Sequence, residues 1–208
     1  MMSPSRSSSM ESVKVHNPEP TFISAKNAVT EETAKILMEL VDERGQTSDW
    51  YENPKCLEFQ IANPFSDKRV NDHRTIKVIP ELFGIAESCM RHINSSFKNS
   101  AFNVALGHHG FWVLKYEESG HFEKHCDFDS GQKGINPTVI ATASILLNND
   151  FEGGDLVVYD CIGNPSMINK EKLKYSLNIW DGFTQHKVTP ITSGKRYALI
   201  MHFTGIEK

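Results

Sequence analysis

The stretch HFEKHCDFD, residues 121–129, carries more metal-binding side chains than one ion needs. It holds two His, one Cys, one Glu and two Asp, and imidazole, thiolate and carboxylate are the groups with which proteins bind transition metals. Gly120 precedes the stretch, and Phe122, Cys126 and Phe128 alternate with polar residues. Because a period of two is typical of a strand, we expect an extended segment rather than a helix.

Two side chains of this stretch are the first candidates for a metal site. Alternate residues of a strand point to one face, which brings His125 and Asp127 together and turns Cys126 to the opposite face. A solvated polar strand face that binds no metal is the alternative. Three residues share the face of His125 but lie farther along the strand, and they are second choices: His121, Glu123 and Asp129.

A third ligand is expected from another strand, and His186 is the candidate. Two His and one carboxylate form the facial triad of non-haem Fe(II) oxygenases, which leaves coordination positions open. Structural zinc would instead use four protein ligands, usually including Cys. Arg196 follows His186 in the next strand pattern, and a guanidinium beside such a triad would bind a carboxylate of an anionic cosubstrate. A surface charge is the alternative for Arg196.

The composition is that of an ordinary globular protein. Of 208 residues, 39% are hydrophobic and 23% are charged, and the net charge of -4 gives no general attraction to nucleic acid. No apolar run approaches the ~20 residues of a spanning helix, so we expect neither nucleic acid nor a membrane as partner. The four cysteines form no CxxC pair, and no secretory signal is apparent. Free thiols and a cytoplasmic location are therefore expected.

Helical patterns occupy the first half of the chain. Residues 1–18 are Ser-rich and are expected to form a flexible tail before a single domain over residues 19–208. The run TEETAKILMELVDERG, from Thr30, predicts a helix with acidic residues in its first turn. A second helix is predicted over PELFGIAESCMRHINSSF, with Pro80 at its first position.

Strand patterns follow. Short apolar runs separated by Gly, Asn, Asp and Pro predict about six to eight strands. The sequence thus indicates an α+β domain, with a helical layer over about residues 28–100 and a β-sandwich or jelly roll over about residues 101–205.

Three ordered segments carry a family resemblance. YEESGHFEKHCD, residues 116–127, fits the pattern Y-x3-G-x-F-x2-H-x-D; TASILLNNDFEGGDL, residues 142–156, contains an LN strand and an FEGG turn; and HKVTPITSGKR, residues 186–196, follows with H-x-V-x-P and a final Arg. Together they resemble the prolyl 4-hydroxylase-like group of Fe(II)/2-oxoglutarate dioxygenases over roughly residues 111–204. The resemblance implies a double-stranded β-helix, a jelly-roll or cupin-like barrel with N-terminal supporting helices.

The resemblance also implies roles for single residues. His125, Asp127 and His186 would bind Fe(II), and Arg196 would pair with the distal carboxylate of 2-oxoglutarate. Tyr116 would hydrogen-bond the same cosubstrate, or it is a core aromatic residue with a satisfied hydroxyl. The implied cofactors are Fe(II) and 2-oxoglutarate, used with O2 and optionally with ascorbate. Two more residues either line the pocket or simply pack, Trp180 and Thr184.

Three positions narrow the expected chemistry. Animal collagen-type enzymes have Lys where this chain has Arg196, which argues against a collagen substrate. His202 stands where relatives often carry Trp and where nucleic-acid-dealkylating relatives carry a second Arg, so nucleic-acid demethylation is not expected. His202 itself either faces the pocket or is a core or rim residue. Asp127 fills the position that related halogenases leave to chloride, so hydroxylation is expected.

The resemblance therefore implies a hydroxylase that inserts one oxygen atom from O2 into a C–H bond and releases succinate and CO2. A prolyl residue of a peptide or protein is the first expectation for the substrate, and a free amino acid or other small metabolite is the second. A non-catalytic jelly-roll binding module and a zinc hydrolase are further alternatives. Loops 45–75 and 129–137 would select the substrate, and the latter is either a lid or a solvated connector.

Overall fold

Two antiparallel sheets form the centre of the structure, a computed structural model that describes residues 23–47, 55–61, 72–96, 102–129, 139–168 and 170–207. The larger sheet has seven strands in the spatial order β1 (Ile23–Ala25), β10 (Leu177–Asp181), β6 (Val139–Leu146), β13 (Arg196–Glu207), β4 (Phe102–Tyr116), β3 (Cys56–Ile61) and β2 (Gln46–Thr47). The smaller has four, β5 (Phe122–His125), β11 (His186–Val188), β8 (Leu156–Tyr159) and β9 (Pro165–Ile168). A separate pair joins β12 (Ile191–Ser193) to β7 (Glu152–Gly153).

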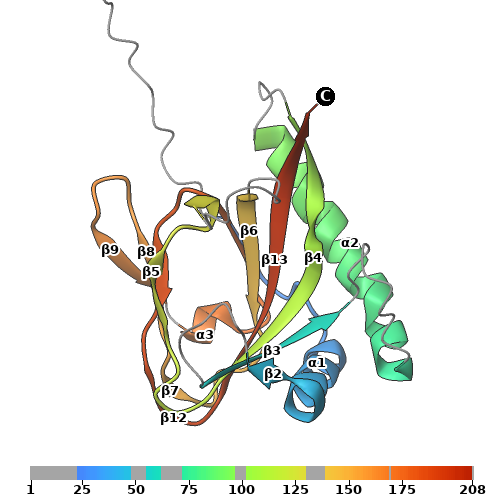
Figure 1. Ribbon diagram of the computed structural model, residues 1–208, viewed down its shortest axis with the longest axis vertical. Coiled ribbons are helices and arrows are strands. Elements are labelled where there is room, and N and C mark those ends of the chain that lie inside the picture. Colours follow the sequence, from blue (N-terminus) through green and yellow to red (C-terminus); the bar gives the residue numbers. More distant parts are fainter. Residues whose placement is uncertain are drawn as a thin grey trace, which may run out of the picture.

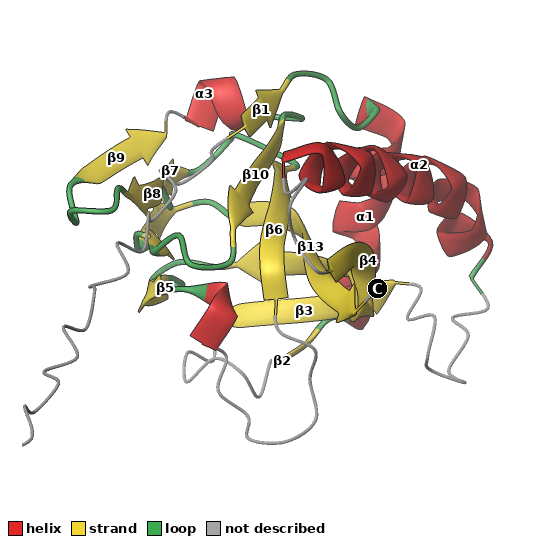
Figure 2. Ribbon diagram, turned by 90° about the horizontal axis from the view of Figure 1, so that it is seen from above, coloured by secondary structure: helices red, strands yellow, loops and turns green. Residues whose placement is uncertain are grey.

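The helices cover only one of the two sheets. Helices α1 (Glu31–Arg44) and α2 (His73–Ser96) lie on one side of the larger sheet, and the smaller sheet lies on the other side (Figure 1, Figure 2). The short helix α3 (Lys170–Leu173) connects β9 to β10. The fold is the double-stranded β-helix with supporting helices that the sequence resemblance implies, and this expectation is confirmed. None of the described helices combines the length and apolar character needed to cross a membrane.

Helix α1 begins where the sequence predicts. Thr30 is the N-cap, and its side-chain oxygen accepts the Thr33 backbone N–H at 3.2 Å. Glu31 and Glu32 occupy the first turn, where the helix dipole favours negative charge. The buried face of α1 includes Leu37 and Leu40, both fully buried, and this face anchors the helix on the sheet.

Helix α2 begins earlier than the sequence predicts. Its first residue is His73, and Asp72 caps it by accepting the Arg74 backbone N–H at 2.8 Å. Pro80 lies inside the helix on its exposed side, so its assignment to a first helical position is wrong. The extra two turns form because the Asp72 cap and the buried Val78 together extend the packed face toward the N-terminus.

The first half of the chain also contributes strands, which the prediction of a purely helical layer missed. β3 pairs with β4 over six residue pairs, from Cys56 opposite Tyr116 to Ile61 opposite Phe111. Its residues lie within the segment 45–75 that the sequence predicts as a loop, because the six-residue pattern CLEFQI is too short to indicate a strand by itself. The tail at 1–18 and most of loops 45–75 and 129–137 lie outside the described residues.

The two faces of strand β13 point into different layers of the fold. Tyr197, Leu199 and Met201 are buried in the core between the larger sheet and the helices. The alternate residues point into the space between the two sheets, because successive side chains of a strand face opposite sides. Arg196 begins this inward series and His202 belongs to it, so β13 positions two of the candidate site residues.

The four cysteines are free thiols, as expected. Cys161 is exposed, Cys126 is half-buried, and Cys56 and Cys89 are buried. Burial raises the pKa of both Cys56 and Cys89 to about 12, which keeps these sulfurs protonated and unreactive at pH 8. We expect a thiol-alkylating reagent at pH 8 to label Cys161 at least about 100-fold faster than Cys56 or Cys89. Peptide mass spectrometry over a time course measures this, and rapid native labelling of Cys56 would contradict its burial.

Candidate metal centre

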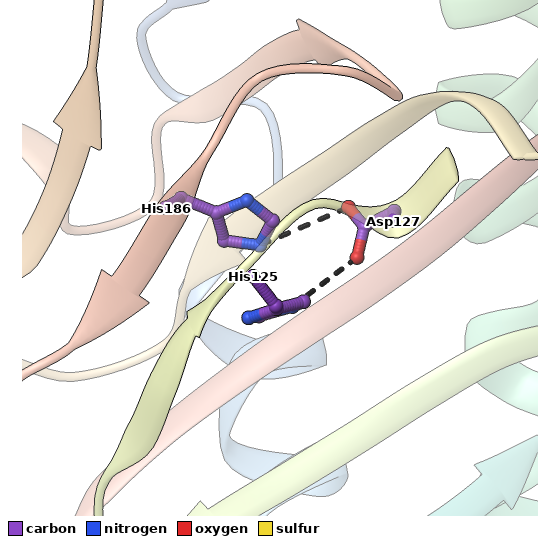
Figure 3. A group of neighbouring side chains, drawn as sticks. All are labelled: His125, Asp127 and His186. Atoms are coloured by element: carbon purple, nitrogen blue, oxygen red, sulfur yellow. Dashed lines mark ion pairs between the residues drawn. The ribbon is translucent and has the colours of Figure 1, made fainter. Parts of the chain in front are cut away.

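Three side chains from two strands and a turn meet between the sheets. His125 ends β5, Asp127 begins the short 3-10 helix η1 (Asp127–Asp129), and His186 begins β11. One nitrogen or oxygen atom from each lies within 4.8 Å of the other two, and Figure 3 shows the three side chains turned toward one another. Asp127 and His186 are buried and His125 is half-buried, so the structure brings together the three ligands proposed from the sequence.

Strand pairing explains why the two histidines meet. His186 is the direct antiparallel partner of His125 in the register of β11 and β5. Side chains directly opposite each other on neighbouring strands lie close enough to touch, and the two imidazole ring centres are 4.3 Å apart. The pairing of β5 with β11 therefore determines the position of two of the three ligands.

Asp127 lies in a turn and not in the strand that the sequence predicts. The strand ends at His125, and Asp127 lies in the following 3-10 turn. The alternation argument placed Asp127 in a continuous strand with His125, which is wrong. The turn bends the chain so that the carboxylate points back at the two rings, with Asp127 Oδ1 3.3 Å from His125 Nε2 and Asp127 Oδ2 3.7 Å from His186 Nε2.

The hydrogen bonds of the imidazoles determine which nitrogen faces the site. His125 Nδ1 lies 2.8 Å from the Glu123 carbonyl oxygen, and His186 Nδ1 lies 3.0 Å from the Thr184 carbonyl oxygen. A carbonyl only accepts, so each Nδ1 carries the proton and donates it. Each ring therefore turns its Nε2 toward Asp127, along the dashed lines of Figure 3.

This arrangement is suited to a metal cation. Two acceptor nitrogens face a carboxylate at close range, and such a group of acceptors requires a proton or a metal ion between its members. Burial lowers the pKa of His186 despite the opposing effect of Asp127, which favours the neutral ring that binds metal. Two imidazoles and one carboxylate are the donor set typical of a non-haem Fe(II) site.

Two further side chains hold the Asp127 carboxylate. Thr142 Oγ1 on β6 donates to Asp127 Oδ2 at 2.5 Å, and the Trp180 indole N–H on β10 points at the same oxygen from 3.4 Å. Burial alone would raise the pKa of Asp127, but hydrogen bonds and nearby imidazoles hold that pKa well below its ordinary value. Trp180 was predicted to line the pocket or to pack, and it contacts the candidate ligand.

Thr142 was not identified as a site residue from the sequence, because its place in a resembling segment does not by itself distinguish it from its neighbours. It lies in the TASILL segment of the family resemblance, and its strand partners are Trp180 on β10 and His202 on β13. Three inward-facing residues on adjacent strands thus form one row beneath Asp127. Only the strand register, which a single sequence does not provide, shows that Thr142 is centred in that row.

Replacing Thr142 with Val should weaken divalent-metal binding while preserving the shape of the side chain. Asp127 would lose the hydrogen bond that orients its carboxylate, and losses of this kind typically cost about 10- to 100-fold in metal affinity. Isothermal titration with Mn(II) measures the change, with Ser144→Ala, two residues along the same face of β6, as the matched control. Equal Mn(II) affinity for Thr142→Val and wild type would contradict the orienting role.

A second polar group lies on the same inward face, where β13 begins. Arg196 is 4% exposed and is the strand partner of Tyr116, which is itself the partner of Cys56. The Arg196 Cζ lies 5.2 Å from the centre of the Tyr116 ring. Burial raises the pKa of Tyr116, so its phenol is neutral. Burial lowers the pKa of Arg196, but a guanidinium keeps its charge in proteins.

The Arg196 guanidinium lacks a full set of partners. Its Nε is buried and has no hydrogen-bond partner among the described residues, and the Asp155 carboxylate acts on it only as a neighbouring charge. A buried positive charge without a partner is costly unless an anion joins it. The corner between Arg196 and Tyr116 is therefore suited to a carboxylate supplied by a ligand.

His202 faces the candidate centre, one of the two positions that the sequence left open for it. Its Nε2 lies 4.0 Å from Asp127 Oδ1. Its ring packs edge-on against Trp112 of β4, with ring centres 5.3 Å apart. The side chain is 18% exposed, so the ring is positioned beside the three proposed ligands rather than in the helix-facing core.

The other polar residues that the sequence offered as site candidates lie apart from the three proposed metal ligands. His121 Nε2 pairs with Glu123 Oε1 at 3.0 Å, and Glu123 is largely exposed. The Asp129 side chain lies outside the described residues. Thr184 is buried, but its hydroxyl donates to Asp181 at 3.0 Å, so it holds the turn before His186 and does not point at the site.

Comparison with known proteins agrees with this geometry. Residues 111–204 match the family model of the 2OG-Fe(II) oxygenase superfamily. A PKHD-type hydroxylase of Pseudomonas putida is 33% identical over 114 residues, which cover 51% of this chain and 49% of that protein. Another, from Idiomarina loihiensis, is 29% identical over 88 residues, or 42% of this chain and 38% of that protein. The chain thus spans less than half the length of these curated relatives.

Solved structures share the fold at low sequence identity. A prolyl hydroxylase of Trichoplax adhaerens, in complex with a hypoxia inducible factor oxygen degradation domain peptide fragment, aligns with a TM-score of 0.66 and 17% identity, covering 88% of this chain and 83% of that chain. A Pseudomonas putida prolyl-4-hydroxylase aligns with a TM-score of 0.60 and 10% identity, covering 88% and 91%. At such identity these alignments show the fold alone.

Proposed function

We propose that this chain, whose residues 111–204 belong to the 2OG-Fe(II) oxygenase superfamily, is an Fe(II)- and 2-oxoglutarate-dependent hydroxylase of a prolyl residue in a peptide or protein. It would insert one oxygen atom from O2 into a C–H bond and release succinate and CO2. A single observation carries the proposal: the ligand atoms of His125, Asp127 and His186 lie within 4.8 Å of one another, on the same inward surface as Arg196, whose buried Nε has no hydrogen-bond partner among the described residues.

The three proposed metal ligands have separate tasks. His125 and His186 present their Nε2 atoms, because backbone carbonyls accept from both Nδ1 atoms. Asp127 supplies the negative charge that a divalent cation needs, and Thr142 fixes the direction of its carboxylate. Fe(II), when bound with 2-oxoglutarate, supplies the O2-dependent oxidation that a protein side chain alone does not perform.

Arg196 and Tyr116 would hold the cosubstrate. The guanidinium would anchor the distal carboxylate of 2-oxoglutarate by charge-assisted hydrogen bonds, which satisfies its buried Nε. Tyr116 is buried, and its hydroxyl would donate to the same carboxylate, while its ring stacks near the guanidinium. The apolar residues of the surrounding cluster, including Leu114 and Leu146, exclude water and so strengthen these interactions.

The prolyl substrate is supported by the relatives rather than by the metal centre. The similar solved structures include prolyl hydroxylases, one of them with a bound peptide fragment. The same fold also serves SnoN, a non-heme alpha ketoglutarate dependent epimerase from nogalamycin biosynthesis, at a TM-score of 0.60 and 14% identity. A free amino acid or other small metabolite is therefore the second candidate substrate. Use of ascorbate, a cytoplasmic location and a single domain over residues 19–208 stay predictions.

The test is succinate release from 2-oxoglutarate with Fe(II) and ascorbate. We would add either the macromolecular or the small-molecule fraction of a cell lysate and use His186→Ala as the blank. Stimulation by the macromolecular fraction supports a protein or peptide substrate, and peptides containing proline are then tested directly. Stimulation by the small-molecule fraction alone rejects the protein substrate. Activity with Zn(II) that needs no 2-oxoglutarate would instead indicate a hydrolase.

A further inference from the structure

An aromatic pair lies exposed at the edge of the candidate metal centre. Phe128 directly follows Asp127, and Phe183 precedes His186 by three residues. The two rings stack with centres 3.8 Å apart and planes 27° from parallel. Phe128 is nevertheless 40% exposed and Phe183 64% exposed, so two stacked phenyl rings on the ligand-bearing segments remain open to solvent.

Hydrogen bonds fix the turn that presents Phe183. The Asp181 carboxylate accepts the Phe183 backbone N–H at 2.9 Å and the Thr184 hydroxyl at 3.0 Å. The Thr184 backbone N–H donates to the Asp181 carbonyl at 3.1 Å. An exposed phenyl ring is thus carried on a turn that the structure holds in one conformation.

Gly182 ties this turn to the segment that carries Phe128. Its N–H donates to the Ile140 carbonyl at 2.9 Å, and its carbonyl accepts the Phe128 N–H at 2.8 Å. A Cβ at position 182 would lie 2.2 Å from the Val139 carbonyl oxygen, so the close approach requires glycine. The two rings are therefore fixed relative to each other and to the neighbouring metal ligands.

We propose that Phe128 and Phe183 form a platform that binds an apolar side chain of a peptide substrate, close in sequence to the residue that reacts. This inference rests on the proposed hydroxylase function and names the substrate class as an extended peptide. Fixed aromatic rings provide apolar contact area at a low cost in conformational entropy, which makes them effective binding surfaces.

The position of the platform argues for a peptide rather than a free amino acid. The rings belong to residues one and three positions from proposed metal ligands, and they are exposed whereas Asp127 and His186 are buried, so they lie outside the buried centre of the site. An extended chain advances about 3.3 Å per residue, which brings a neighbouring residue of a peptide to this border. A free amino acid has no neighbouring residue to place on the rings.

The experiment pans a random heptapeptide display library against the protein loaded with Mn(II) and 2-oxoglutarate, which fills the site without turnover. Retained peptides are synthesised with a fluorescent label, and their dissociation constants are measured by polarisation. We expect Phe183→Ala to weaken their binding about tenfold. Phe183→Tyr keeps the ring and should bind within about twofold of wild type, as should Ile162→Ala, which removes an exposed apolar side chain from the turn between β8 and β9.

The outcomes separate this inference from the proposed function. Binding of 2-oxoglutarate to the Mn(II)-loaded wild type, measured by calorimetry, tests the cosubstrate site without any peptide. If 2-oxoglutarate binds but no heptapeptide is retained, or if Phe183→Ala binds the peptides as wild type does, the platform is rejected and the hydroxylase proposal stands. If 2-oxoglutarate does not bind, the proposed function fails, and the platform fails with it.

Discussion

Asp127→Ala is expected to lower succinate release from 2-oxoglutarate by about a thousandfold or more. The substitution removes the only carboxylate among the three proposed ligands, so two neutral imidazoles would remain to hold a divalent cation. Mn(II) binding, measured by calorimetry, should weaken in parallel with turnover. The loss of both properties together would identify Asp127 as a metal ligand, because a residue that only contacts substrate would leave metal binding intact.

The matched control is Glu123→Ala. Glu123 is a carboxylate two residues from His125 on the same strand, but it is largely exposed and pairs with His121. Its removal should leave turnover within about twofold of wild type. Thermal unfolding of both variants would show that the fold persists. Turnover by Asp127→Ala near the wild-type level, or a large loss in Glu123→Ala, would show that the ligand assignment is wrong.

Much of the site could be predicted because its chemistry is local in sequence. His125 and Asp127 are two residues apart, so an extended or tightly turned segment, unlike an α-helix, turns both side chains to one side. His186 and Arg196 are linked to them by the order of the resembling segments. The structure places His186 directly opposite His125, which is the relation that a third ligand from a neighbouring strand requires.

The missed features depend on long-range contacts. Thr142 is recognisable only when the register of β6 against β10 and β13 is known, and a single sequence does not determine strand register. The strand β3 forms because β4 offers it a pairing edge, whereas its own six residues are too short to be distinctive. The early start of α2 was missed because Pro80 favours a first helical position, whereas the cap at Asp72 becomes apparent only from its hydrogen bond to the Arg74 backbone.

Arg196→Met is expected to raise the KM for 2-oxoglutarate by about 100-fold or more, because the distal carboxylate would lose the charge-assisted hydrogen bonds that the guanidinium would donate. The maximal rate at saturating 2-oxoglutarate should fall much less, since Arg196 would hold the cosubstrate away from the bond that reacts. Tyr116→Phe, which removes only a hydroxyl from the adjacent ring, should raise the KM by less than about tenfold. An unchanged KM in Arg196→Met would reject its role in cosubstrate binding.

Arg196→Met should also raise the stability of the ligand-free protein, although it weakens cosubstrate binding. Without ligand, Arg196 is a buried charge whose Nε has no hydrogen-bond partner among the described residues, and replacing buried charged groups with apolar side chains of similar volume is often neutral or stabilising, by up to about 4 kcal/mol. Urea unfolding should therefore show a higher free energy of unfolding for Arg196→Met than for ligand-free wild type. Added 2-oxoglutarate with Mn(II) should stabilise wild type more than the variant, because a ligand stabilises only the folded protein that binds it. If Arg196→Met is less stable than wild type and binds 2-oxoglutarate equally well, Arg196 supports the fold. A role in binding the cosubstrate instead predicts higher stability and weaker 2-oxoglutarate binding.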